Sequence, residues 1–233
     1  MYISEVEFEP ILSTSVRQAK YWKNGVEHIL SEKRAQHGAE TKAITIDKND
    51  FYVVGYERNG SFDVAKYWKN GEPFELSAGN SNAGATGIEV INGNVHVSGH
   101  EFINGIAVPT YWLNAVPTRL SNPGVGYWTS GMAISNGNVF ITVRENGGSV
   151  QTPDKVGYWK VGSSIVELSA GGYHAEVNGI AADGNDVYVV GAYRFDGGPS
   201  SACIWKNGEI AKLPTAGSRS SEATAIFLAK EPL

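Results

Sequence analysis

The stretch Tyr67-Trp68-Lys69-Asn70-Gly71 decides the fold, because the chain repeats it. Related pentapeptides begin at Tyr21, Tyr111, Tyr158 and Ile204, and successive tryptophans are 46, 44, 47 and 46 residues apart. A fixed period of this length is typical of repeat architectures, in which each copy folds as one supersecondary unit. Because the copies cover nearly all of the 233 residues, we expect a single domain over residues 1–233.

The second copy contains four short strand patterns separated by turns. Residues 42–47 alternate in polarity, residues 51–57 are rich in β-branched and aromatic side chains, and further strand patterns follow at 65–69 and 72–76. Asn70-Gly71 predicts a tight hairpin between the last two, because both turn positions need positive φ. Four antiparallel strands per period of 44–47 residues predict an all-β fold, a β-propeller with one blade per repeat.

The two ends of the chain set the predicted number of blades. Residues 1–7 align with the second strand at 51–57, and residues 223–228 align with the first strand around Ile44. The C-terminal segment would therefore supply the inner strand that the N-terminal blade lacks, and this pairing closes the ring without an open sheet edge. We predict a five-bladed β-propeller with four antiparallel strands per blade.

Each repeat tryptophan belongs to the third strand pattern of its copy. An aromatic ring there can bury on the order of 200 Å² between adjacent blades. Five copies in register favour packing over five ligand sites, so Trp68→Ala should cost several kcal/mol as a core deletion.

Composition and charge exclude several classes of function. The net charge of −5 disfavours nucleic acid and anionic membranes as partners, since both select basic surfaces. No apolar stretch is long enough for a transmembrane helix, and the first residues lack the pattern of a signal peptide.

The single cysteine, Cys203, lies in an apolar run and is expected to be buried. His96 and His100 are about 13 Å apart along a strand, too far for one zinc ion, so we expect neither a metal nor a cofactor.

The repeats resemble the Trp-Lys-Asn-Gly repeats of uncharacterised bacterial propeller proteins. The residues that carry this resemblance are Val187 to Gly191 and Ala65 to Gly71, and similar segments cover most of the chain. The resemblance implies a β-propeller, often secreted or on the cell surface, with no established activity. The likeness to a five-bladed sugar-binding lectin concerns the fold alone.

A binding site is expected on the propeller face that carries the long, variable loops. Glutamates recur there at the end of the second strand, and a hydrogen bond copied with each blade explains them better than a ligand ring does. A second repeat position, four residues before the apolar residue of the first strand, varies between copies. Trp128 departs most from the residues of the other copies at this position, and it follows Tyr127 in the predicted loop from Ser121 to Gly131. Aromatic rings beside carboxylates suit a sugar, although Trp128 could equally fill a gap between blades. The candidate ligand-binding residues are Tyr127, Trp128, Tyr173, His174, Glu40, Glu176 and Glu222.

These features favour a non-catalytic, monomeric binding module for a glycan or a protein. A scaffolding propeller is the second hypothesis. The third is a glycoside hydrolase, which needs two carboxylates about 5–10 Å apart, with Glu40, Glu176 and Glu222 as candidates. The chain lacks long insertions beyond the repeat, which argues against an enzyme.

Overall fold

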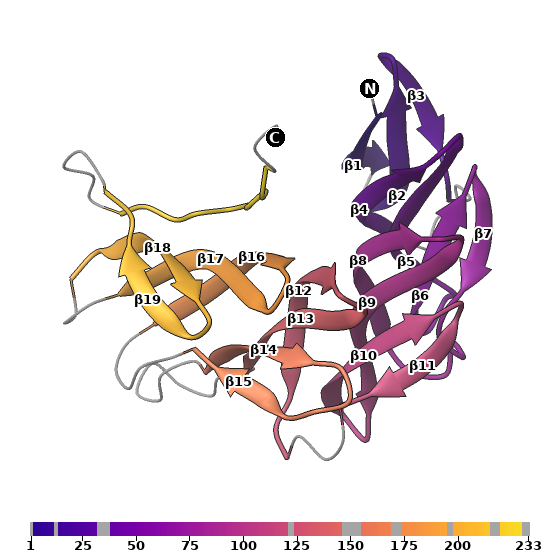
Figure 1. The fold of residues 1–233 in the computed structure, drawn as a ribbon. Helices are drawn as coiled ribbons and strands as arrows, with labels where there is room; N and C mark the ends of the chain where they lie inside the picture. Colours follow the sequence, from indigo (N-terminus) through magenta and orange to yellow (C-terminus); the bar gives the residue numbers. More distant parts are fainter. Residues whose placement is uncertain are drawn as a thin grey trace. The chain divides into compact units, whose positions relative to one another are not determined.

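The computed structural model describes residues 2–11, 14–31, 38–120, 124–145, 155–168, 174–194, 198–214 and 220–229, with side chains from residue 17 onward. The described residues contain strands and turns but no helix (Figure 1). The chain divides into two compact units, residues 1–119 and residues 120–233.

The first unit contains three antiparallel sheets, and in each of them strands that follow one another in sequence are neighbours. The first sheet has three strands and the other two have four. The strands are β1 (Tyr2–Ile11), β2 (Thr14–Lys23) and β3 (Val26–Ile29); β4 (Ala39–Asp47), β5 (Asp50–Arg58), β6 (Asp63–Lys69) and β7 (Glu72–Glu75); β8 (Ala83–Ile91), β9 (Asn94–Ile103), β10 (Ile106–Leu113) and β11 (Val116–Arg119).

The second unit contains two four-stranded sheets of the same topology. Their strands are β12 (Tyr127–Ser135), β13 (Asn138–Glu145), β14 (Val156–Lys160) and β15 (Ile165–Glu167); β16 (Ala175–Asp183), β17 (Asp186–Arg194), β18 (Ser200–Lys206) and β19 (Glu209–Lys212). The prediction of an all-β chain with one antiparallel sheet per repeat is therefore confirmed, and this arrangement fits a propeller-like fold. Residues 221–229 are extended but belong to no sheet (Figure 1).

The recurrent Asn-Gly pair forms the predicted tight turn between the third and fourth strands. Asn70 and Gly71 have φ values of 52° and 93°, which asparagine and glycine tolerate best. The asparagine also fixes the preceding hairpin, since Asn70 Oδ1 accepts a hydrogen bond of 3.1 Å from the Phe51 backbone N–H. Asn207 accepts the same bond from Val187 at 2.8 Å. This double role explains why asparagine recurs at this position.

Repeat tryptophans fill the space between consecutive sheets within each unit. Trp68 is fully buried among Ala19 and Tyr21 of the first sheet and Phe51 and Val53 of its own. Trp112 and Trp205 pack in the same way against the sheets that precede theirs. The predicted packing role is confirmed for these three tryptophans.

Candidate functional site

A β-bulge interrupts the first two strands of four sheets at the same place. The pairing of β4 with β5 shifts between Thr41 and Ala43, and β8, β12 and β16 show corresponding shifts. Pairing continues beyond each bulge, toward the end of the sheet that carries the longer connections. The cross-strand pairs there, called the pre-bulge pairs, are Glu40–Tyr56, Gly84–His100, Trp128–Arg144 and Glu176–Ala192.

The register corrects one expectation and supports another. The prediction that Trp128 lies in a loop is wrong, because β12 begins at Tyr127 and stays paired across its bulge. For the same reason β4 begins at Ala39, before the predicted start at residue 42. The alignment of Glu40, Trp128 and Glu176 at one repeat position is confirmed by their equivalent pairings.

The bulge explains a glycine that recurs on the second strand. A Cβ atom on Gly55 would lie 1.8 Å from the Glu40 carbonyl oxygen, and Gly191 meets Glu176 at 1.9 Å in the same way. The fourth sheet has Val143 at this position, and there the bulge is widened by Ser130 and Gly131. The Thr142 hydroxyl fills the widened bulge, accepting a bond of 2.8 Å from the Gly131 N–H.

Trp128 differs from the repeat tryptophans in its exposure. Its exposed fraction is 39%, whereas Trp68, Trp112, Trp159 and Trp205 are at most 1% exposed and the fifth repeat tryptophan, Trp22, has intermediate exposure. It therefore does not serve as a core plug within its unit. Trp128 pairs across the strands with Arg144, and Tyr127 beside it pairs with Glu145. Burial, followed by the charges of Glu145 and Glu167, raises the pKa of Tyr127.

Arg144, the cross-strand partner of Trp128, contacts a second polar pair on the fifth sheet. Arg144 Nη1 lies 3.6 Å from Glu176 Oε1, and His174 Nε2 lies 2.9 Å from the same oxygen. The inner strands β12 and β16 are held together nearby by a 2.8 Å bond from the Ser130 hydroxyl to the Val177 carbonyl. Trp128, Arg144, His174 and Glu176, called the Trp128 cluster, thus come from two adjacent sheets of one unit.

The Trp128 cluster offers a flat apolar ring beside hydrogen-bond donors and an acceptor. Arg144 and His174 both contact Oε1 of Glu176, and within the described part of the chain no group donates to Oε2. A carboxylate oxygen of this kind accepts hydroxyl hydrogen bonds, and a guanidinium or imidazole N–H donates them. About a third of the Glu176 and His174 side chains is exposed, at 32% and 35%. A ligand with an apolar face and several hydroxyls can therefore use all four side chains.

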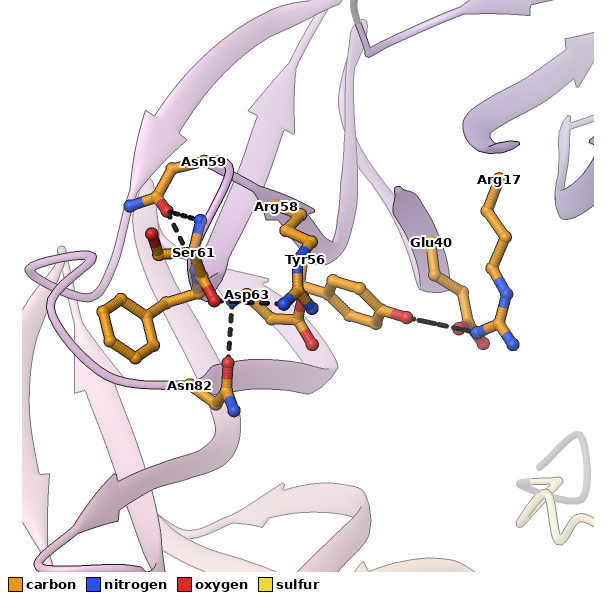
Figure 2. Close-up of polar contacts among 9 residues, drawn as sticks. Arg17, Glu40, Tyr56, Arg58, Asn59, Ser61, Asp63 and Asn82 are labelled. Carbon is orange, nitrogen blue, oxygen red and sulfur yellow. Dashed lines mark hydrogen bonds and ion pairs between the residues drawn. The ribbon is translucent and has the colours of Figure 1, made fainter. Parts of the chain in front are cut away.

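Glu40, the equivalent of Trp128 in the second sheet, has a different environment. Its Oε2 accepts bonds from Tyr56 Oη at 2.9 Å and Arg17 Nη1 at 3.1 Å (Figure 2). Lys42 Nζ contacts the other oxygen, Oε1. Burial acts to raise the pKa of Glu40, but the hydrogen bonds from Lys42 and Tyr56 and the charges of Lys42 and Arg17 leave it below its ordinary value. Arg17, Glu40, Lys42 and Tyr56 form what we call the Glu40 cluster.

The remaining predicted site residues lie apart from these contacts or outside the described residues. Glu222 is exposed and belongs to no strand. Tyr173 lies outside the described residues. The two arginines, Arg17 and Arg144, together with Lys42 and Tyr56, were missed by the sequence reasoning. Aligning the second strands would have found Tyr56 and Arg144, because they occupy one repeat position.

The recurrent glutamates at the end of the second strand make ion pairs inside their own sheets. Glu57 Oε2 lies 2.9 Å from Lys66 Nζ, and Glu101 Oε2 lies 2.6 Å from Arg119 Nε. The expected structural role is confirmed for these two. Cys203 is buried as expected, and burial raises the pKa of its thiol to about 12.

Two searches of the described residues give negative results. No group of three or more His, Cys, Asp or Glu side chains is placed to hold a metal ion in that part of the chain. Nor does the described part contain a helix long and apolar enough to cross a membrane.

Comparisons with known proteins show only that the fold of this chain is similar to parts of solved structures. No family model matches the sequence, and no curated protein matches it. A puromycin-hydrolyzing peptidase of Mycobacterium tuberculosis superposes with a TM-score of 0.51 at 12% identity, over 92% of this chain and 37% of the peptidase chain. The GH43B protein of the Bacteroides ovatus xyloglucan PUL gives 0.43 at 13% identity, over 93% of this chain and 50% of that one. The chain thus spans half or less of the length of these two structures.

Proposed function

We propose that this chain is a non-catalytic binding module that holds a glycan through the Trp128 cluster. The observation that carries the proposal is the exposure of Trp128, 39%, at a repeat position that breaks the symmetry of the chain. An indole face can stack on the apolar face of a sugar ring, while the Glu176 carboxylate accepts hydrogen bonds from its hydroxyls and Arg144 and His174 donate to them. Tyr127, which precedes Trp128 on β12, is the neighbouring aromatic residue of the proposed site.

A glycan array with matched variants tests this proposal. Trp128→Ala should lose at least about tenfold in affinity for any sugar that the wild type binds, roughly 1.4 kcal/mol. Phe74→Ala is the control, because Phe74 is an aromatic residue of similar exposure, 42%, on the outer strand β7. Glu176→Gln keeps the shape of the site and should weaken binding as well. Absence of binding to every sugar, or equal binding by Trp128→Ala, overturns the glycan proposal.

We also propose that the fold is a five-bladed ring closed by the C-terminal segment. In the second unit, Asn178 Nδ2 donates to the Ala223 carbonyl at 3.0 Å, at the repeat position where Ser130 donates to Val177 at 2.8 Å. Residues 221–229 therefore lie beside β16 as β16 lies beside β12. The Ser221 hydroxyl also accepts from the Ala202 N–H at 3.0 Å, as Ser31 does from Ala19. These contacts support the proposal that residues 221–229 supply the inner strand that the three-stranded first sheet lacks.

Engineered disulfides test this closure at the level of register. Ala43 pairs with Val54 in the second sheet, and the equivalent residues are Ala225 and Ser4. Ala225→Cys with Ser4→Cys, in a Cys203→Ala background, should form an intramolecular disulfide on mild oxidation, since Cα atoms of paired residues are about 4.5–5.5 Å apart. Ala225→Cys with Ile3→Cys is the control, because a shift of one residue turns the side chain to the other face. Closure is refuted by equal yields from both pairs, by no disulfide, or by a disulfide-linked dimer instead.

A further inference from the structure

The bulge of the fourth sheet is wider than those of the other three bulged sheets. Two residues of β12, Ser130 and Gly131, stand opposite one residue of β13, Thr142, and Gly131 and Thr142 are not paired in the register of these strands. The equivalent residues of the second, third and fifth sheets remain paired, as Ala43–Val54, Gly87–Ser98 and Gly179–Val190. Among these four sheets, the one that carries Trp128 is thus the one in which this pair is open.

A chain of hydroxyl bonds takes the place of the open pair. The Gly131 N–H donates to Thr142 Oγ1 at 2.8 Å, and Thr142 has no exposed surface. Thr142 Oγ1 lies 2.8 Å from Ser130 Oγ, and the Ser130 hydroxyl donates to the Val177 carbonyl at 2.8 Å. Because a hydroxyl has one hydrogen and Ser130 uses its own toward Val177, Thr142 is the donor between the two hydroxyls. The Gly131 carbonyl, at 3.2 Å, is the more distant acceptor for the same proton.

This chain of bonds, which we call the Ser130 link, joins the fourth sheet to the fifth beside the Trp128 cluster. Its members are one or two residues from members of the cluster: Ser130 from Trp128 on β12, Thr142 from Arg144 on β13, and Val177 from Glu176 on β16. Two residues along a strand span about 7 Å. The link therefore ties together the three strands that carry most of the cluster.

Thr142 departs from the repeat without a change of volume. The second and fifth sheets have a buried valine at this position, Val54 and Val190. Valine has nearly the shape of threonine but cannot accept a bond from the opposite N–H. The third sheet has Ser98 there, whose hydroxyl makes no hydrogen bond among the described residues, so a hydroxyl alone does not open the pair. The fourth sheet combines the hydroxyl of Thr142 with that of Ser130.

We propose that Ser130 and Thr142 are positioning residues of the glycan site. They act through the Trp128 cluster, because the link between the sheets keeps its two halves, one on each sheet, in a fixed relation. Fixed side chains lower the entropy cost of organising a site around a sugar. The predicted effect on affinity rests on the glycan proposal, whereas the effect on Trp128 is measured without a sugar.

Thr142→Val tests the proposal, because it places in the fourth sheet the residue that two other sheets carry. The variant should fold with a melting temperature close to that of the wild type, but it cannot form the Ser130 link. With 5-fluorotryptophan in the chain, the fluorine NMR signal of Trp128 is assigned by its absence in Trp128→Phe. This signal should shift or broaden in Thr142→Val and in Ser130→Ala.

Sugar affinity is then measured on the glycan array, with the sugar that the wild type binds most strongly as the probe. Ser130→Ala and Thr142→Val should each weaken binding at least fivefold, whereas Thr142→Ser keeps the hydroxyl and should bind like the wild type. Ser163→Ala is the control, because it removes a hydroxyl bond of 2.9 Å to the Lys160 carbonyl within the same sheet. It should leave both the affinity and the Trp128 signal unchanged.

The outcomes separate this inference from the glycan proposal. An unchanged Trp128 signal in both Ser130→Ala and Thr142→Val overturns the positioning role. So does wild-type affinity in both of them when Trp128→Ala binds weakly. If no sugar binds the wild type, the glycan proposal fails and the fluorine signal alone decides whether the link positions Trp128. If Thr142→Val does not fold, Ser130→Ala, at an exposed position, decides the test.

Discussion

Replacing Trp68 measures how much one repeat tryptophan contributes to the fold. The side chain has no exposed surface and lies among Ala19, Tyr21, Phe51 and Val53, which come from two sheets. Because backbone on both sides is held by hydrogen-bonded strands, the neighbours cannot collapse into the space that Trp68→Ala leaves. We expect a loss of about 3–5 kcal/mol in the free energy of unfolding, the range for large aromatic deletions in cores. Urea denaturation followed by circular dichroism measures it.

The indole nitrogen allows a finer test of the same reasoning. Trp68 Nε1 is buried with no hydrogen-bond partner among the described residues, whereas Trp205 Nε1 donates to the Leu168 carbonyl at 3.1 Å. Trp205→Phe leaves that carbonyl unsatisfied and should cost about 1–3 kcal/mol more than Trp68→Phe. Trp128→Ala, at an exposed position, should cost less than about 1 kcal/mol. The packing argument fails if Trp68→Ala costs no more than Trp128→Ala.

Three other predictions concern the turn, the bulge and the Glu40 carboxylate. Asn207→Ala should lower stability by about 1–3 kcal/mol in urea denaturation, because it removes the 2.8 Å bond to the Val187 N–H and places alanine at a φ of 52°; an effect below about 0.5 kcal/mol contradicts the proposed double role. Gly55→Ala should cost about 1–3 kcal/mol or more, because its Cβ would meet the Glu40 carbonyl oxygen at 1.8 Å, whereas the control Gly38→Ala meets Arg17 Cβ at 3.9 Å and should be nearly neutral; equal melting temperatures for the two variants would count against the bulge geometry. Because the pKa of Glu40 is lowered from 4.5 in the folded state, its stabilising contribution is complete above that value and is lost as the pH falls through the folded-state pKa. Denaturation curves between about pH 5 and about pH 3 should therefore show a smaller acid-induced loss of stability for Glu40→Gln than for the wild type, and identical losses refute this role.

The sequence predicted those features of the fold that depend on residues within a single repeat. The Asn-Gly turns require positive φ, and the tryptophans are buried between sheets. Both sequence patterns recur with the period of the repeat. The bulges were missed because their cause lies across the sheet. Gly55 is needed for the approach of the Glu40 carbonyl on the neighbouring strand, and no pattern within β4 indicates where that carbonyl lies.

Missing the bulges had a direct effect on the predicted site. With β4 and β12 expected to begin later, Glu40 and Trp128 were assigned to loops, where cross-strand partners cannot be assigned. The structure pairs them with Tyr56 and Arg144. These partners vary between sheets as much as the predicted residues do, so the variation concerns pairs of positions and not single positions.

The bulge divides each repeat into two parts with different physical requirements, and the variable pairs lie in one of them. Positions on the core side of the bulge carry the tryptophan and the asparagine whose replacement costs stability, so most sheets keep the same residues there. Beyond the bulge the strands remain hydrogen-bonded, and Ala39 and Ala175 there still pack in the core. The pairs Glu40–Tyr56 and Trp128–Arg144 are at least partly exposed, so they can differ between sheets at little cost to packing. A binding site requires a rigid backbone at positions where the side chains can vary without loss of stability. The Trp128 cluster, which we propose as a ligand site, lies in this part of the repeat and includes the pair Trp128–Arg144.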